Sequence, residues 1–159
     1  KEYELAWDHF ISHDDPLYVS EHRKSFVINH ELPDKIINNS DITIMAISAT
    51  RLNVLEAIKK LADNGIRCNL INLFWLKPVK NLNKLIKAVD NSKHGGLILD
   101  GDYANGVAKT IAYDIMQKSN KKVGVLALEE RAAGFAPHLD NLPPSPQKIY
   151  EEVRKIVAK

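Results

Sequence analysis

The sequence predicts an α/β domain in which helices cover both faces of a mainly parallel sheet, giving a three-layer α/β/α sandwich. Two observations predict it. Short runs that are apolar at almost every position recur along the chain, and segments with helical periodicity separate them. Such runs are typical of strands buried on both faces, and their alternation with helices favours a parallel sheet. The run from Asp41 to Ser48 shows the pattern most clearly.

The first two runs and the helix between them form a predicted strand–helix–strand unit. After the run at 41–48, Thr50 can cap a helix with one apolar face. Asn64 and Gly65 then supply a helix stop, and residues 66–73 are the second strand. The connection between two parallel strands of this kind is expected to be right-handed.

The remainder of the chain continues the alternation as far as a long irregular segment, residues 129–146, which contains four prolines. At its end, Ser145 followed by Pro146 is typical of an N-cap with proline in the first helical position. The remaining elements are expected at residues 81–90 (helix), 96–99 (strand), 105–116 (helix), 123–128 (strand) and after 146 (helix).

The first forty residues do not resemble the start of a compact domain. They begin with a helical pattern that has no clear apolar face, and short strand candidates follow at 17–20 and 26–28. Residues 29–40 contain Pro, Asn and Ser, which are typical of a linker. We therefore expect residues 1–40 to be the tail of a preceding domain plus a linker, and residues 41–159 to be the α/β domain.

Composition excludes some classes of partner. The net charge of +2 gives no electrostatic reason to expect nucleic acid or a membrane surface. No apolar run is long enough to span a membrane and no signal peptide opens the chain, so we expect a cytoplasmic protein. Cys68 is the only cysteine, which excludes an internal disulfide, and its apolar surroundings predict a buried small side chain.

Phosphate-binding glycine loops are not evident. The residues that follow the first apolar run, Ser48 to Thr50, include no glycine. Gly101 and Gly106 lie at a predicted helix start whose backbone amides could bind an anion. Because Asp100 and Asp102 would repel a phosphate, a plain turn before a helix is the favoured interpretation.

Metal and nucleophile motifs are also missing. His9 and His13 have the i, i+4 spacing of a metal-ligand pair, but no third ligand accompanies them, which favours a solvated surface. No serine has the glycine neighbours of a nucleophile elbow. The sequence thus predicts no catalytic, cofactor-binding or metal-ligating residue.

Several short motifs, each weak alone, occur in a characteristic order. They are Asp41-Ile-Thr-Ile-Met before a helix with Leu55-Glu-Ala57, Asn64-Gly-Ile66 leading to Lys77-Pro78, Gly96 to Asp100 with the helix after Gly106, and Asn141-Leu-Pro143 before Ile149. In this order they resemble the C-terminal domain of transketolase-type thiamine enzymes, most closely the β subunit of 2-oxoacid dehydrogenase E1 components such as pyruvate dehydrogenase. Residues 15–23 resemble the last strand of that family's pyrimidine-binding domain.

The resemblance implies a five-stranded, mostly parallel sheet with one antiparallel strand. It also implies that the complete enzyme binds thiamine diphosphate and magnesium on two other domains, so that this chain alone is noncatalytic. Its role would be mainly structural, at a subunit interface with a second copy or an E1 α-like chain, with an E2 acyltransferase as a further partner. The alternative is a stand-alone doubly wound module that binds a nucleotide or a protein.

Candidate site residues follow from the strand ends, because ligands of open α/β sheets bind outside the carboxyl ends of the strands. In the segment after the last strand, Arg131 and His138 could hold an anionic substrate group at a substrate entrance. Aromatic side chains are enriched in interface cores. The expected interface residues are Phe74, Trp75, Tyr103 and Phe135.

Overall fold

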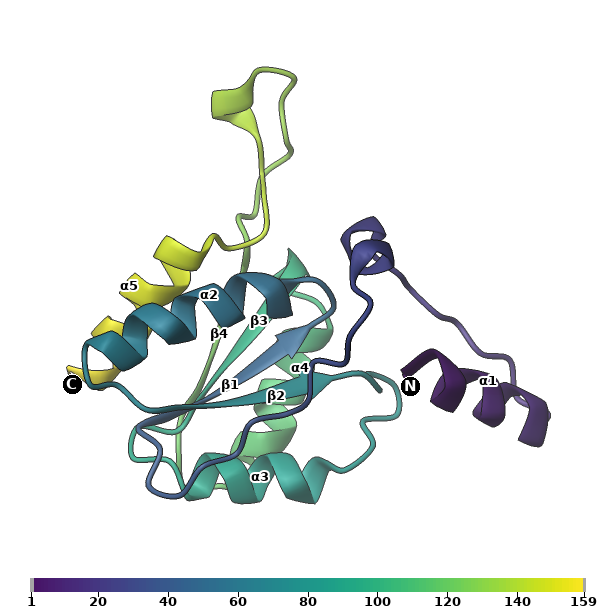
Figure 1. The fold of residues 1–159 in the computed structure, drawn as a ribbon, viewed down its shortest axis with the longest axis horizontal. Helices are drawn as coiled ribbons and strands as arrows, with labels where there is room; N and C mark the ends of the chain where they lie inside the picture. The colour runs from purple at the N-terminus through teal and green to yellow at the C-terminus, as the bar shows by residue number, and fades with distance from the viewer. Residues whose placement is uncertain (1, 159) are drawn as a thin grey trace. The chain divides into compact units, whose positions relative to one another are not determined.

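The computed structural model describes residues 2–158 and confirms the three-layer α/β/α sandwich (Figure 1). Among these residues one sheet is formed, with the strand order β2-β1-β3-β4 and every neighbouring pair parallel. Its strands are β1 (Ile42–Ile47), β2 (Cys68–Leu73), β3 (Gly96–Tyr103) and β4 (Val123–Leu128). The helices that cover it are α2 (Thr50–Asp63), α3 (Leu82–Asp90), α4 (Val107–Met116) and α5 (Pro146–Val157).

Two hydrophobic cores lie on the two faces of the sheet. β1 is the centre of both, because all six of its residues are buried. Alternate side chains such as Ile44 pack under α2 and α5, while Met45 packs against α3 and α4 on the other face. Cys68 is 3% exposed and belongs to the first core, which confirms the prediction of a buried side chain. Burial raises the pKa of its thiol to about 12, so it stays protonated at ordinary pH.

The expectation of a fifth, antiparallel strand is wrong in detail. The segment 34–37 runs antiparallel beside β2, but only Lys35 forms a backbone bridge, exchanging two hydrogen bonds of 2.8 Å with Leu70. On either side of the bridge, side chains replace the backbone partners of a ladder. The Ile37 N–H donates to Asn69 Oδ1, and the Asn72 N–H donates to Asp34 Oδ1. The outer edge of β2 is therefore covered without a regular strand.

A buried polar cluster connects this segment to the sheet. Asn69, 1% exposed, donates from Nδ2 to the hydroxyls of Ser40 and Thr43 at 2.9 Å. The Ser92 hydroxyl lies 2.7 Å from each of the same two hydroxyls, at the C-terminal end of α3. Because every member is hydrogen-bonded, the cluster fixes how the covering segment, β1, β2 and α3 meet at the amino edge of the sheet.

Helix starts and turns follow the sequence in most places. Ser145 Oγ accepts the Lys148 N–H at the start of α5, as its position before Pro146 predicts. Before β3, Gly95 has a φ of +79°, and a Cβ atom there would lie 2.2 Å from the Lys122 carbonyl oxygen. Only glycine fits this left-handed turn. Thr50 does not cap α2, since its hydroxyl bonds the end of β1 instead.

The chain divides into two compact units, with the boundary between Pro33 and Asp34. The first unit holds α1 (Glu2–Ser12) and a 3-10 helix, η1 (Arg23–Val27). The two short strands expected in this region are wrong: residues 17–20 have no regular structure and Phe26 lies in η1. Over residues 2–33, no neighbouring strand is present to accept their backbone hydrogen bonds. Over residues 2–158, no helix is both long and apolar enough to cross a membrane.

Candidate functional site

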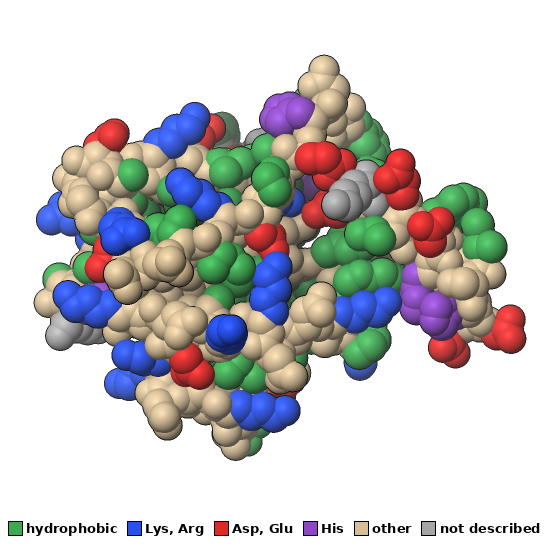
Figure 2. Space-filling view, turned by 60° about the horizontal axis from the view of Figure 1, so that its bottom comes forward, with side chains coloured by type: hydrophobic (Ala, Val, Ile, Leu, Met, Phe, Trp, Pro, Cys, Tyr) green, Lys and Arg blue, Asp and Glu red, His purple; other side chains and the backbone are tan. Residues whose placement is uncertain are grey.

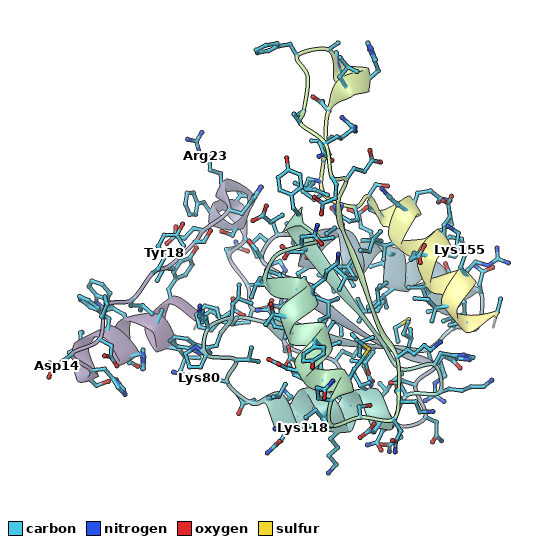
Figure 3. The ribbon with its side chains drawn as sticks, turned by 180° about the vertical axis from the view of Figure 1, so that it is seen from behind. Asp14, Tyr18, Arg23, Lys80, Lys118 and Lys155 are labelled. Carbon is cyan, nitrogen blue, oxygen red and sulfur yellow. The ribbon has the colours of Figure 1, made fainter. Side chains whose placement is uncertain are left out.

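The carboxyl edge of the sheet is the natural place to look for a site. The connections from β1 and β3 diverge to opposite faces of the sheet, so the switch point of this topology lies between these two neighbouring strands. Their ends deliver Ser48 and Thr50 on one side and Asp100 to Asp102 on the other. Residues 129–144, which we call the arm, project from the same edge in both ribbon views (Figures 1 and 3).

The protein's own hydrogen bonds join the two strand ends at the switch point. The Thr50 hydroxyl donates to the carbonyl of Ile47 at 2.7 Å and lies 3.3 Å from that of Leu99, so it joins the ends of β1 and β3. The returning end of the arm lies across this point, and a Cβ atom built on Gly101 would contact the Pro143 ring at 3.7 Å. Pro144 is buried, and its carbonyl accepts a hydrogen bond from the Asn53 side chain.

Asp100 is the one carboxylate that the sheet buries at this edge. It is 4% exposed, and its Oδ1 accepts the Asp102 N–H at 3.1 Å. Its Oδ2 has no hydrogen-bond partner among the described residues. Burial raises the pKa of Asp100, and the negative charge of Asp102 raises it further, against the hydrogen bonds from the backbone. The two acidic side chains, Asp100 and Asp102, rather than the raised pKa, make this edge unfavourable for an anion such as a phosphate.

The arm is held in its shape by one arginine and one asparagine. The Arg131 guanidinium donates to the carbonyls of Leu139 and Asp140, and its Nε donates to Glu129 Oε2 at 2.7 Å. Asn141 bonds the backbone N–H and carbonyl of Glu129 and also the carbonyl of Arg131. The hydrogen bond from Arg131 lowers the pKa of Glu129, so the pair stays ionised at neutral pH. Most of the guanidinium's donors are thus directed at the arm's own backbone.

The other candidate residues of this region lie on or beside the arm. His138 is exposed in a short 3-10 helix, η2 (Pro137–Leu139), and its backbone adjoins the two carbonyls that Arg131 binds. Phe135 is fully exposed near the tip. Tyr103, at the end of β3, is 40% exposed and donates its hydroxyl to the Arg131 carbonyl at 3.3 Å. The fold therefore brings Arg131, His138, Tyr103 and Phe135 to one projecting structure.

Phe74 and Trp75 leave the sheet at the end of β2, on the opposite side of the sheet from β4. Their rings contact edge to face, with centroids 5.3 Å apart, and the Lys80 ammonium lies 3.5 Å from the Trp75 centroid. Both side chains are half-buried and neither belongs to the two hydrophobic cores. They form a second aromatic group at the carboxyl edge, separate in the sheet from Tyr103.

The residues at this edge do not fit a thiamine diphosphate and magnesium site. Asp100 and Asp102 would repel the diphosphate. Within the described residues, no group of three or more His, Cys, Asp or Glu side chains could hold a metal ion. The rings of His9, in α1, and His13, just after its end, do lie together with centroids 3.9 Å apart, but no third ligand joins them among residues 2–158.

A parallel sheet of strand order β2-β1-β3-β4 with helices packed on both faces is a doubly wound α/β domain. The family model described as "Transketolase, C-terminal domain" matches residues 35–149, and the chain belongs to this family. The β subunit of the pyruvate dehydrogenase E1 component from Mesostigma viride is 29% identical over 85 residues, which cover 45% of this chain and 26% of that protein. The chain thus spans about a quarter of the length of this curated relative.

Two solved structures share the fold. A split-gene transketolase, described as an inactive beta4 tetramer, superposes with a TM-score of 0.65 at 17% identity, over 76% of this chain and 39% of that one. The 2-oxoglutarate:ferredoxin oxidoreductase from Magnetococcus marinus gives a TM-score of 0.58 at 15% identity, over 84% and 21% of the two chains. Its structure holds 2-oxoglutarate, coenzyme A and succinyl-CoA.

Sequence reasoning missed two residues that shape this edge. Asn141 hydrogen-bonds the backbone at the base of the arm, and Pro143 lies beside Gly101 at the end of β3. A weak signal existed for Asn141, because an amide just before a pair of prolines is typical of a fixed turn. Nothing in the sequence pairs Pro143 with Gly101, since that contact joins segments far apart in the chain.

Proposed function

We propose that the chain is the C-terminal, mainly structural and subunit-interface part of a thiamine-diphosphate-dependent enzyme. The complete enzyme would be of the 2-oxoacid dehydrogenase E1 β-like or transketolase-like type, with the cofactor and magnesium held by other domains. Asp100 and Asp102 carry this proposal, because two acidic side chains at the strand ends where doubly wound domains bind ligands disfavour a phosphate group there. The same observation disfavours the alternative of a stand-alone nucleotide-binding module.

Residues 1–40 are proposed as the tail of a preceding pyrimidine-binding domain plus a linker, with residues 41–159 as the C-terminal domain. The first compact unit supports this, because α1 buries only Ala6. Trp7 and Ile11 are 64% and 71% exposed on the same helix. Side chains of this size are normally buried by a domain, and here they would pack against the rest of the preceding one.

The proposed interface consists of Phe74, Trp75, Tyr103 and Phe135, and it faces a second copy of the chain or an E1 α-like chain. An E2 acyltransferase is a further proposed partner of the assembled enzyme. All four aromatic side chains are half-buried or exposed at the carboxyl edge or on the arm. Aromatic groups in such positions are typical hot spots, where truncation costs about 2 kcal/mol or more of binding energy.

Trp75→Ala tests the interface directly. We expect association, measured by sedimentation, to weaken by more than about tenfold, because a large aromatic contact is lost while the core is untouched. Tyr113→Ala is a matched control, since Tyr113 is 58% exposed on the outer side of α4. Circular dichroism and urea unfolding show whether the variant is folded. Unchanged association, or a variant that unfolds, would assign Trp75 to packing within the domain.

Arg131 and His138 are proposed to border the substrate entrance of the complete enzyme. Their placement on a rigid arm beside the carboxyl edge supports this, but the guanidinium of Arg131 is mostly engaged by the arm's own carbonyls. Arg131 would then act as a positioning residue that sets the arm, leaving His138 exposed toward an anionic group. The substrate affinity of the complete enzyme carrying Arg131→Ala tests the proposal.

A further inference from the structure

The outer edge of β4 is the open edge of this sheet. The opposite edge, along β2, is covered by residues 34–37, whereas no strand within the unit that begins at Asp34 pairs with the far side of β4. Gly124, Val125, Leu126 and Leu128 are half-buried, while every residue of β1 is buried. The Asn141 side chain hydrogen-bonds the backbone N–H and carbonyl of Glu129, so the part of the edge that is open to a new strand ends at Leu128.

This edge lacks the usual protection against pairing. Native edge strands are commonly blunted by a charged side chain, a proline or a bulge in the strand. β4 reads Val-Gly-Val-Leu-Ala-Leu and has none of these in its six residues. Alternate residues therefore present unpaired backbone N–H and C=O groups over the length of a typical strand.

The charges at the two ends of β4 indicate what pairs with it. Lys121 and Lys122 precede the strand, and Glu129 and Glu130 follow it. When a second copy of β4 lies antiparallel, the basic end of each strand meets the acidic end of the other, and the apolar centres face each other. Opposite charges across antiparallel strands are stabilising, whereas a parallel second copy would place like charges together.

Symmetry restricts the register. Residues opposite each other in an antiparallel pair point to the same face of the sheet. A two-fold axis perpendicular to the sheet must therefore lie midway between one residue and its own copy in the second strand. With the axis at Val125, Lys121 lies opposite Glu129 of the second copy and Lys122 is a diagonal neighbour of Glu130. With the axis at Leu126, Lys122 lies directly opposite Glu130. Lys122 and Glu130 are thus neighbours across the strands in both registers.

We propose that β4 is a self-association edge, which pairs antiparallel with β4 of a second copy of this chain to make one continuous sheet. This surface is separate from Phe74 and Trp75, which follow β2 at the other edge of the sheet, whereas Tyr103 lies beside its carboxyl end. The inference does not depend on thiamine chemistry and extends the description of the family fold to a specific contact.

A charge-reversal cycle tests the proposal. Lys122 and Glu130 are exposed, and neither side chain makes a hydrogen bond or ion pair within the part of the chain that the structure describes. Lys122→Glu and Glu130→Lys should each weaken self-association about tenfold at low salt, since the two symmetric pairs become repulsive. The double variant should restore association to within about threefold, because the pairs are attractive again. Lys59→Glu and Glu56→Lys, exposed on α2, are matched controls and should have no effect.

Amide exchange in β4 separates this edge from any other interface. At protein concentrations where sedimentation shows association, alternate amides of residues 123–128 should exchange at least tenfold more slowly than in the dilute monomer. Association without this protection, a chain that stays monomeric throughout, or a double variant as weak as the single ones would each overturn the proposal.

Discussion

Asn69 connects the segment that covers the edge of β2 to the sheet, and its replacement is predicted to destabilise the domain. The side chain makes three hydrogen bonds of 2.9 Å, to Ser40, Thr43 and the Ile37 N–H, at a site 1% exposed. Each such bond contributes roughly 1 kcal/mol to stability. Asn69→Ala removes all three, while Ser92 continues to satisfy the two hydroxyls. We expect a loss of about 3 kcal/mol in the free energy of unfolding.

Urea unfolding of the chain and of Asn69→Ala measures this loss. The midpoint should fall while the dependence of the unfolding free energy on urea stays the same, because the native fold is kept. Asn91→Ala is the control, since Asn91 is exposed at the end of α3 and should change stability by less than about 0.5 kcal/mol. Equal effects of the two substitutions would refute the stabilising role of the buried polar cluster.

Two further predictions concern the carboxyl edge. Because the pKa of Asp100 is raised in the folded state, folding becomes less favourable as pH rises through that pKa. In urea unfolding at pH 7, Asp100→Asn should therefore be more stable than the parent chain, and this difference should shrink as the pH falls toward 3.8. A difference in stability that does not change with pH would contradict this prediction. Arg131→Ala should speed proteolysis of the arm about tenfold with less than about 1 kcal/mol of global change, because the arm is exposed. Arg131→Lys, which keeps only the charge, should speed proteolysis of the arm to a similar extent. Unchanged substrate affinity of the complete enzyme with Arg131→Ala would exclude a role at the substrate entrance.

The regular elements could be predicted because each has a strong local signal. Three local signals are found where the sequence places them: the mostly apolar run of β1, the Asn64-Gly65 stop of α2 and the Ser145-Pro146 start of α5. The antiparallel fifth strand could not be predicted correctly. Whether the segment before Asp41 forms a ladder or a single bridge depends on the side chains of Asp34 and Asn69, which replace backbone partners across the edge.

The candidate residues could be placed at the carboxyl edge because strand ends are visible in the sequence. Their partners could not, because these partners depend on how the arm folds back. Arg131 is directed at carbonyls that only the folded arm brings together, and Pro143 approaches Gly101 from a distant part of the chain. Over the face shown in Figure 2, Lys and Arg side chains are dispersed among acidic and hydrophobic ones. The near-neutral composition predicts such a distribution, since no single charge dominates.

The most direct test of the proposed division of labour is a calorimetric titration of the chain with thiamine diphosphate in the presence of magnesium. Because Asp100 and Asp102 oppose a diphosphate and the described residues form no group of acidic or histidine side chains that could hold magnesium, we predict no saturable binding to this chain. The complete enzyme, which supplies the other two domains, should bind the cofactor in the same titration. Saturable, magnesium-dependent binding to the chain of residues 1–159 alone would contradict the proposal that it is a noncatalytic interface domain.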